Sequence, residues 1–168
     1  PVVTDPELHA MLTGEKLNEE GVVYGDIVDN TGPVSAWFHL VIDVLFGRSL
    51  LARHVLAFII IFCHSAFIGI IFITKKVFNE NTFIPSLIFS VLYFFSFDTL
   101  ALTDELIGSG FLLLALNNLF KEIEFRMPRD ETTFNLGIYL SLASLCYLPY
   151  LVFLFAVVVM LFLFARTD

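Results

Sequence analysis

Apolar residues are concentrated in long runs separated by short polar stretches. The longest unbroken run covers residues 50–74, and a helix of about 25 residues crosses a hydrocarbon layer roughly 30 Å thick. Lys75 and Lys76 follow its last residue, so we expect a transmembrane helix here. His64 lies in its interior, and a histidine at membrane depth is either a functional group or a bonding partner of a neighbouring helix.

The remaining apolar runs are shorter, and each predicts a further helix in the membrane. We expect spans near residues 83–97, 106–120, 135–145 and 149–165, the third of them short. The last two come from one long run, which we divide before Pro149 because proline removes a helical hydrogen bond and clashes with the preceding turn. A single kinked, tilted helix is the alternative for this run.

Residues 34–47 form an amphipathic segment that is too short to span a membrane. Ser35, His39 and Asp43 recur every four residues and share one narrow polar stripe of a helix, whereas Trp37 and other apolar residues cover the remaining surface. We expect an interfacial helix along the membrane surface. The Ser/His/Asp set does not predict a hydrolase triad, because one straight helix points all three side chains sideways and supplies no oxyanion hole.

Residues 1–33 are polar and acidic, and we expect them to form an extramembrane loop. Within it, residues 8–12 predict a short helix that begins after Asp5 and Pro6 and ends at Gly14. Later glycines and a proline indicate an irregular path back toward the membrane.

The composition excludes an ordinary soluble domain. Hydrophobic residues make up 58% of the 168 positions and charged residues 15%, against roughly 45–50% and 25% in soluble domains. A chain of this size cannot cover so much apolar surface with its own core, whereas lipid tolerates it. The predicted fold class is all-α: a polytopic membrane helix bundle (48–168) with an extracytoplasmic acidic loop (1–33) and an interfacial amphipathic helix (34–47).

Basic residues set the predicted orientation, because Lys and Arg near the ends of spans stay on the cytoplasmic side. With alternating spans, one side receives Lys75, Lys76, Lys121, Arg126, Arg129 and Arg166. The loops expected on the other side, 98–105 and 145–148, contain no Lys or Arg. We therefore expect a multi-pass protein of the cell membrane with residues 1–49 outside the cytoplasm. The net charge of −8 argues against nucleic acid as a partner.

Residues 5–53 carry a series of short motifs, although the chain has no phosphate-binding glycine loop, no paired metal spacing and no nucleophile elbow. Acidic residues are followed by Gly, Tyr, Asp and small residues up to a Pro, then by a segment ending in Phe-Gly-x-Ser, then by an Arg. In chain order these are Asp5 and Glu7, Gly21 with Tyr24 and Asp26, residues 31–33, residues 45–49, and Arg53. This order resembles the first extracytoplasmic loop of the GT-C type glycosyltransferases, which use polyprenyl-phosphate-linked sugars.

Residues 137–149 are similar to a helix break found in the same superfamily. Tyr147 stands where a basic residue is common, and the acidic motif is Asp-Pro-Glu rather than an adjacent pair. The layout also resembles an uncharacterised family of bacterial polytopic inner-membrane proteins, divergent or inactive relatives of those enzymes.

The resemblance implies roles for several side chains. Asp5 or Glu7 would be the general base that deprotonates an acceptor hydroxyl, and Arg53 would hold the lipid phosphate through paired N–H contacts. The side chains that would bind substrate, or a divalent cation, are Tyr24, Asp26, Asp29, Asp104 and Glu105. Simpler alternatives are a helix cap for Asp5, a turn for Asp29, and an Arg53 that extends to lipid headgroups.

Two functions from different classes remain open. One is a sugar transferase on the outer face of the membrane, and the other is a non-enzymatic structural or accessory subunit of a larger membrane or envelope complex; a transporter is third. In a transferase, Asp5 or Glu7, Arg53, and Asp104 or Glu105 should converge on one water-filled cavity beneath the surface helix. In a subunit whose partners are the lipid bilayer and other membrane subunits, the same residues should scatter into solvent.

Overall fold

The computed structural model describes residues 5–20, 31–78, 82–96, 101–125 and 130–165, and the regular elements in these ranges are all helical. This confirms the all-α expectation. In chain order they are α1 (Asp5–Glu20), α2 (Pro33–Phe46), α3 (Leu50–Thr74), α4 (Ile84–Ser96), α5 (Asp104–Phe125), α6 (Asp130–Cys146), the 3₁₀ turn η1 (Leu148–Tyr150) and α7 (Leu151–Ala165).

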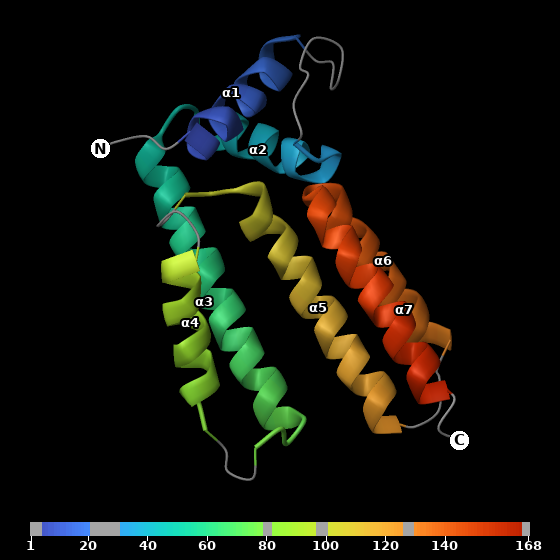
Figure 1. The fold of residues 1–168 in the computed structure, drawn as a ribbon. Coiled ribbons are helices and arrows are strands. Elements are labelled where there is room, and N and C mark those ends of the chain that lie inside the picture. Colours follow the sequence, from blue (N-terminus) through green and yellow to red (C-terminus); the bar gives the residue numbers. More distant parts are fainter. Residues whose placement is uncertain (1–4, 21–30, 79–81, 97–100, 126–129, 166–168) are drawn as a thin grey trace.

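The helices form two layers (Figure 1). From α3 to α7 they run alternately down and up, and α1 and α2 lie across the upper ends of this bundle. The most extensive packing is between α5 and α6, between α1 and α2, and between α3 and α4. Because the helices alternate, Lys75, Lys76 and Lys121 lie at the end of the bundle away from α1 and α2, whereas Asp104 and Glu105 lie near them.

Two helices are long and apolar enough to cross a membrane. These are α3, with 25 residues, and the first 20 residues of α5, Asp104–Ile123. Shorter apolar helices cover Pro33–Phe46, Ile84–Phe95 and Leu148–Met160. The two long helices support membrane insertion, and the helix predicted over residues 50–74 has the expected bounds.

The helices α5 and α6 are longer than the apolar runs that predicted them. Instead of residues 106–120 and 135–145, they cover Asp104–Phe125 and Asp130–Cys146. Each begins with an acidic pair, Asp104 and Glu105 in α5 and Asp130 and Glu131 in α6. Carboxylates in the first turn stabilise a helix through its dipole, so the helix extends beyond the apolar positions on which the prediction was based.

The predicted break before Pro149 is confirmed. Tyr147 has an extended backbone, η1 places Pro149 in a single tight turn, and α7 then runs back alongside α6 in the opposite direction (Figure 1). The alternative of one kinked helix is therefore wrong. Proline provides the reason, since its ring and its missing N–H exclude a continuous helix at this position.

Gly14 does not end a helix as predicted, because α1 continues through it to Glu20. The glycine instead allows α1 to lie directly on α2. A Cβ atom at residue 14 would stand 2.8 Å from the carbonyl oxygen of His39. Part of the predicted extramembrane loop is therefore an ordered helix, and its glycine has a packing role rather than a terminating one.

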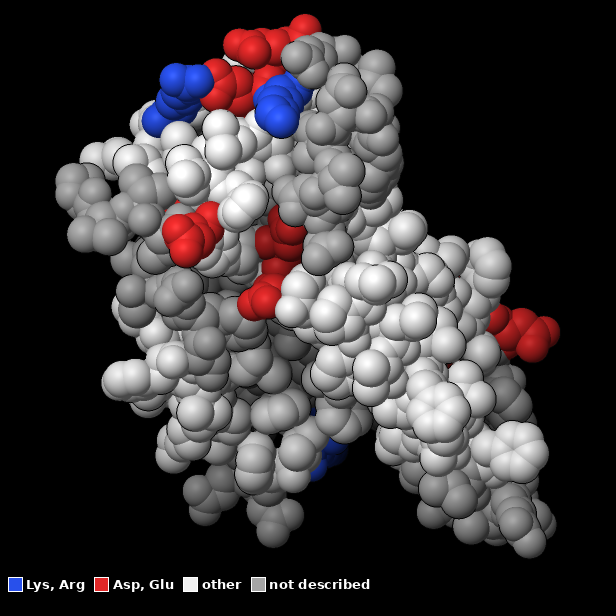
Figure 2. Space-filling model, turned by 45° about the horizontal axis from the view of Figure 1, so that its top comes forward, with Lys and Arg blue, Asp and Glu red and all other residues white. Residues whose placement is uncertain are grey.

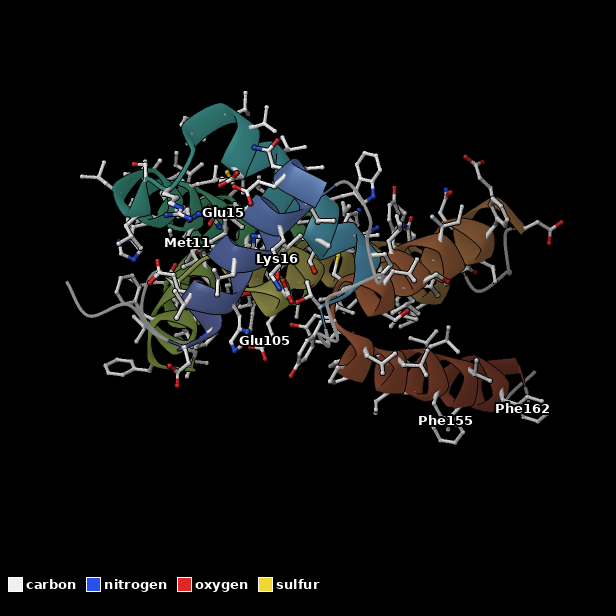
Figure 3. All side chains as sticks on the ribbon, turned by 90° about the horizontal axis from the view of Figure 1, so that it is seen from above. Met11, Glu15, Lys16, Glu105, Phe155 and Phe162 are labelled. Carbon is white, nitrogen blue, oxygen red and sulfur yellow. The ribbon has the colours of Figure 1, made fainter. Side chains whose placement is uncertain are left out.

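Two clusters of buried apolar residues hold the bundle together. The upper cluster contains Ile42, Ala57, Ile61, Tyr93, Leu102 and Leu106, and the lower one contains Ala115, Leu136 and Leu140. The side of α7 that bears Phe155 and Phe162 faces away from the other helices (Figure 3). Much apolar surface thus remains outside the core, as expected where lipid or another protein covers it.

Candidate functional site

The helix α2 turns its polar stripe toward the bundle and its apolar side outward. Ser35, His39 and Asp43 are buried, whereas Trp37 is 64% exposed and Leu45 67% exposed. A helix at the surface of a soluble domain has the reverse arrangement. In Figure 2 charged side chains gather around the end covered by α1, while the flanks of the bundle on that face carry mostly uncharged residues.

His39 forms the first of three polar contacts beneath α1 and α2. Its Nε2 atom lies 2.9 Å from Oδ1 of Asp104 at the start of α5. The histidine is fully buried, and the Asp104 side chain is 23% exposed. This pair connects α2 to the bundle at a site that sequence analysis assigned to substrate binding through Asp104.

The second contact joins Asp43 of α2 to Arg53 of α3. Oδ1 of Asp43 lies 4.0 Å from Nη2 of Arg53, at the limit of an ion pair, and Asn18 of α1 donates a 3.4 Å hydrogen bond to the other carboxylate oxygen. Both charged side chains are buried. The carboxylate of Asp43 partly compensates the positive charge of the Arg53 guanidinium without forming a hydrogen bond with it.

The third contact joins Glu7 of α1 to His54 of α3. Oε1 of Glu7 is 2.8 Å from Nε2 of His54, close enough for an ion pair, but the angles do not meet those of a hydrogen bond. Glu7 is 3% exposed although it lies in the first turn of its helix. Arg53 also interacts electrostatically with Glu7. The second and third contacts are therefore joined, and His39 of the first lies one helical turn from Asp43 on the buried side of α2. We call these residues the buried polar cluster: Glu7, His39, Asp43, Arg53, His54 and Asp104.

Several atoms of the buried polar cluster have no hydrogen-bond partner among the described residues. They are Nε, Nη1 and Nη2 of Arg53, Nδ1 of His39 and Oε1 of Glu7. Buried polar groups are nearly always hydrogen-bonded, and leaving one unsatisfied costs about 1–3 kcal/mol, more if it is charged. The guanidinium of Arg53 is the most demanding of these, because the residue is only 1% exposed and all three of its nitrogens lack a partner.

The structure brings together some of the residues that the sequence predicted. Glu7, Arg53 and Asp104 belong to the buried polar cluster, whereas Asp5 is exposed at the start of α1. Glu105 lies beside them but binds elsewhere: its backbone oxygen accepts a 3.0 Å hydrogen bond from Tyr150, and its carboxylate raises the pKa of Tyr147 through a hydrogen bond. Tyr24, Asp26 and Asp29 are outside the described residues.

His39, Asp43 and His54 are the site residues that sequence reasoning missed. The polar stripe of α2 was a signal for the first two, because a polar face on a membrane-surface helix must meet either water or polar partners. Their partners come from other helices, however, and no sequence spacing shows those contacts.

Metal binding finds no support in the part of the chain that the structure describes. No group of three or more His, Cys, Asp or Glu residues there is placed to hold a metal ion. Asp26 and Asp29, the candidates for a divalent cation, are outside that part.

Comparison with known proteins identified no relative. No family model matches the chain, and neither a curated protein nor a solved structure matches it.

Proposed function

We propose that the chain is an integral membrane protein with several spans, and that its buried polar cluster binds the phosphate of a lipid-linked sugar for transfer to an acceptor. This is the donor class used by the GT-C type glycosyltransferases that the sequence resembles. In this proposal α1 and α2 lie outside the cytoplasm, and the basic ends near Lys75 and Lys121 lie inside.

The unpartnered guanidinium of Arg53 is the observation that carries the proposal. Its five N–H donors form a planar fork that matches the oxygens of a phosphate or carboxylate. Asp43 lies at 4.0 Å and forms no hydrogen bond with it, and no other described residue does, so among these residues the donors remain free for a ligand. A phosphate oxygen accepting from Arg53 would satisfy the most costly unpaired group of the cluster.

The buried carboxylate of Glu7 favours a sugar phosphate over inorganic phosphate as the ligand. Its Oε1 atom is buried 2.8 Å from Nε2 of His54 but accepts no hydrogen bond from a described residue, and Glu7 interacts electrostatically with Arg53. A ligand that complements both residues therefore presents acceptor oxygens to Arg53 and hydroxyl donors to Glu7. A sugar phosphate has both.

The position of the cluster fits a lipid-linked ligand. Arg53 lies in the first turn of α3, the clearest membrane-spanning candidate, and α2 lies across the end of the bundle with Trp37 on its outer face. Tryptophan is enriched at the level of lipid headgroups. A phosphate attached to a membrane-embedded chain would reach Arg53 at this depth.

Binding of a short-chain polyprenyl phosphate to the protein in lipid nanodiscs tests the proposal. Loss of the charged hydrogen bonds in Arg53→Gln should weaken binding about 10–100-fold, since such bonds contribute about 1.5–3 kcal/mol. Arg48→Gln is the matched control, because Arg48 is exposed and pairs with Glu15 on the surface. Inorganic phosphate and phosphatidic acid are the competing ligands. Equal binding by both variants, or preference for either competitor, would overturn the proposal.

A structural or accessory subunit is the second candidate, and the exposed surface of α7 favours it. Val152, Phe155 and Phe162 are each at least 70% exposed, and α7 packs mainly on α6 and η1. Extraction of the native protein in mild detergent, followed by mass measurement, tests this function. A stable complex with another membrane protein supports it, and a chain that is extracted alone contradicts it.

A further inference from the structure

The contact between His39 and Asp104 restricts the protonation of the histidine. A carboxylate only accepts hydrogen bonds, so the 2.9 Å contact requires a hydrogen on Nε2 of His39. Nδ1 is buried and has no partner among the described residues. In the neutral ring this atom carries a lone pair, whereas a protonated ring would bury an N–H group without an acceptor. The neutral tautomer with hydrogen on Nε2 is therefore the one that the site favours.

We propose that His39, oriented by Asp104, is the base that removes the proton from the acceptor hydroxyl; this rests on the proposed function. The acceptor O–H bond breaks and its proton goes to Nδ1 of His39. The acceptor oxygen bonds to the anomeric carbon of the donor sugar, and the bond from that carbon to the phosphate oxygen breaks. The electron pair of that bond stays on the phosphate, which Arg53 holds.

His39 suits this role better than Glu7, which the sequence suggested. Oε1 of Glu7 already lies 2.8 Å from His54, and Arg53 is close enough to interact with it electrostatically. Oε1 of Glu7 thus already has a basic neighbour, whereas Nδ1 of His39 has no partner among the described residues. Carboxylate–histidine pairs are also the common arrangement by which a base is held in one tautomer. Glu7 then contacts sugar hydroxyls, while His39 accepts the proton.

The charged and titratable groups around His39 come from four helices. Asp104 of α5 contacts His39 directly, and Asp43 lies one turn along on the same buried side of α2. Glu105 follows Asp104 in α5, and Arg53 and His54 of α3 with Glu7 of α1 are connected to His39 through Asp43. At the position of His39, α1 lies directly on α2, since a Cβ on Gly14 would approach the His39 carbonyl oxygen to 2.8 Å. The contact of α1 at this position is thus with the backbone of α2, whereas the ring of His39 meets Asp104 of α5.

Nitrogen NMR of the protein in nanodiscs, with ¹⁵N-labelled histidine, tests the tautomer without any substrate. The four histidines are assigned by single substitutions. At pH 7 we expect an unprotonated Nδ1 and a protonated Nε2 for His39, and a mixture of tautomers in Asp104→Asn, whose amide can donate as well as accept. A protonated Nδ1 in the unsubstituted protein would overturn the assignment to His39.

Hydrolysis of short-chain polyprenyl-phosphate hexoses, with water as the acceptor, tests the catalytic role. His39→Gln keeps an N–H donor for Asp104 but has no basic nitrogen. We expect kcat to fall about 10²–10⁴-fold while donor binding changes less than twofold. His9→Gln, on the exposed side of α1, is the control. An unchanged kcat in His39→Gln, or a wild-type protein that binds donor and releases no sugar, would overturn the inference.

The two proposals fail separately. If the short-chain polyprenyl phosphate does not bind, the proposed function is wrong whatever the tautomer of His39. If the phosphate binds through Arg53 but Nδ1 is protonated or His39→Gln retains its rate, only the assignment of the base is wrong.

Discussion

Burial gives single polar residues of this protein unusual importance. Arg53 is 1% exposed and its nearest carboxylate, on Asp43, remains at 4.0 Å. The apolar side of α2 faces away from the bundle, so its polar residues, Asp43 among them, lie on the buried side together with Arg53. In such surroundings the loss of one partner leaves the other as an uncompensated buried charge.

Removal of Asp43 should therefore be strongly destabilising. We expect Asp43→Ala to lower the free energy of unfolding by about 3 kcal/mol, because Arg53 would remain buried without its carboxylate. Unfolding by SDS in mixed micelles measures the change. Asp130→Ala, at the exposed start of α6, is the control and should have a far smaller effect. Equal effects of the two substitutions would mean that Arg53 is not held by Asp43.

Two glycines should respond in opposite directions to the same substitution. A Cβ on Gly32 would lie 1.9 Å from the carbonyl oxygen of Leu145, whereas a Cβ on Gly137 meets nothing within 4 Å. Gly32→Ala should destabilise the protein by about 3 kcal/mol through this backbone clash. Gly137→Ala, inside α6, should stabilise it by roughly 0.5–1 kcal/mol, because alanine favours a helix. Thermal unfolding in detergent would separate the two, and a stable Gly32→Ala variant would contradict the close approach of α2 and α6.

At the scale of the elements, small hydroxyl side chains join α3 to α4. Oγ of Ser65 donates a 2.7 Å hydrogen bond to the carbonyl oxygen of Ser86 and lies 3.0 Å from its hydroxyl. Gly69 lies one turn further along α3 and also approaches Ser86. A Cβ atom added at Gly69 would stand 3.0 Å from the Cβ atom of Ser86. Small residues and hydroxyl groups are typical of close helix contacts in membranes.

The contact between α3 and α4 should weaken when its central hydroxyl is removed. We expect Ser65→Ala to cost about 1 kcal/mol of unfolding free energy, the usual contribution of such bonds between membrane helices. Ser141→Ala is the matched control, because the Ser141 hydroxyl is exposed and, among the described residues, donates to the carbonyl oxygen of Gly137 in its own helix. If the two substitutions lower the unfolding free energy equally, Ser65 does not stabilise the contact between α3 and α4.

Apolar runs and proline were sufficient to predict most elements, but not their polar ends. The run over residues 50–74 and the break before Pro149 were recovered, since both follow from local chemistry. The helix through Gly14 was missed, because its reason is the backbone of His39 on another helix. Likewise His39 meets Asp104, 65 positions away. Contacts of this kind depend on the tertiary fold, so the sequence indicated polar candidates but not their pairing.

The whole molecule has two unlike ends. The end near α1 and α2 carries the buried polar cluster, and the opposite end carries Lys75, Lys76 and Lys121 (Figure 1). Between them the flanks are largely uncharged on the face shown in Figure 2. A bilayer placed around these flanks would put the basic end in the cytoplasm and the cluster outside.

Labelling of single cysteines tests this orientation in cells. Cys63 and Cys146 are first replaced by alanine, and Ser49→Cys, Phe78→Cys or Glu131→Cys is then added at an exposed position. An impermeant maleimide should label Ser49→Cys in intact cells, and the other two only after the membrane is opened, because α3 separates residue 49 from residue 78 by about 25 residues of apolar helix, roughly the bilayer thickness.

The pattern of labelling identifies which helix crosses. If residues 49 and 78 are labelled alike, α3 does not span the membrane and the proposal of a transmembrane protein is wrong. If residue 78 is protected but residue 131 is labelled from outside, α3 crosses as expected but the pair α4 and α5 does not return the chain to the cytoplasm. The buried polar cluster would still lie outside in that case, because residue 49 directly precedes the turn of α3 that carries Arg53. The site and the number of spans are therefore tested independently.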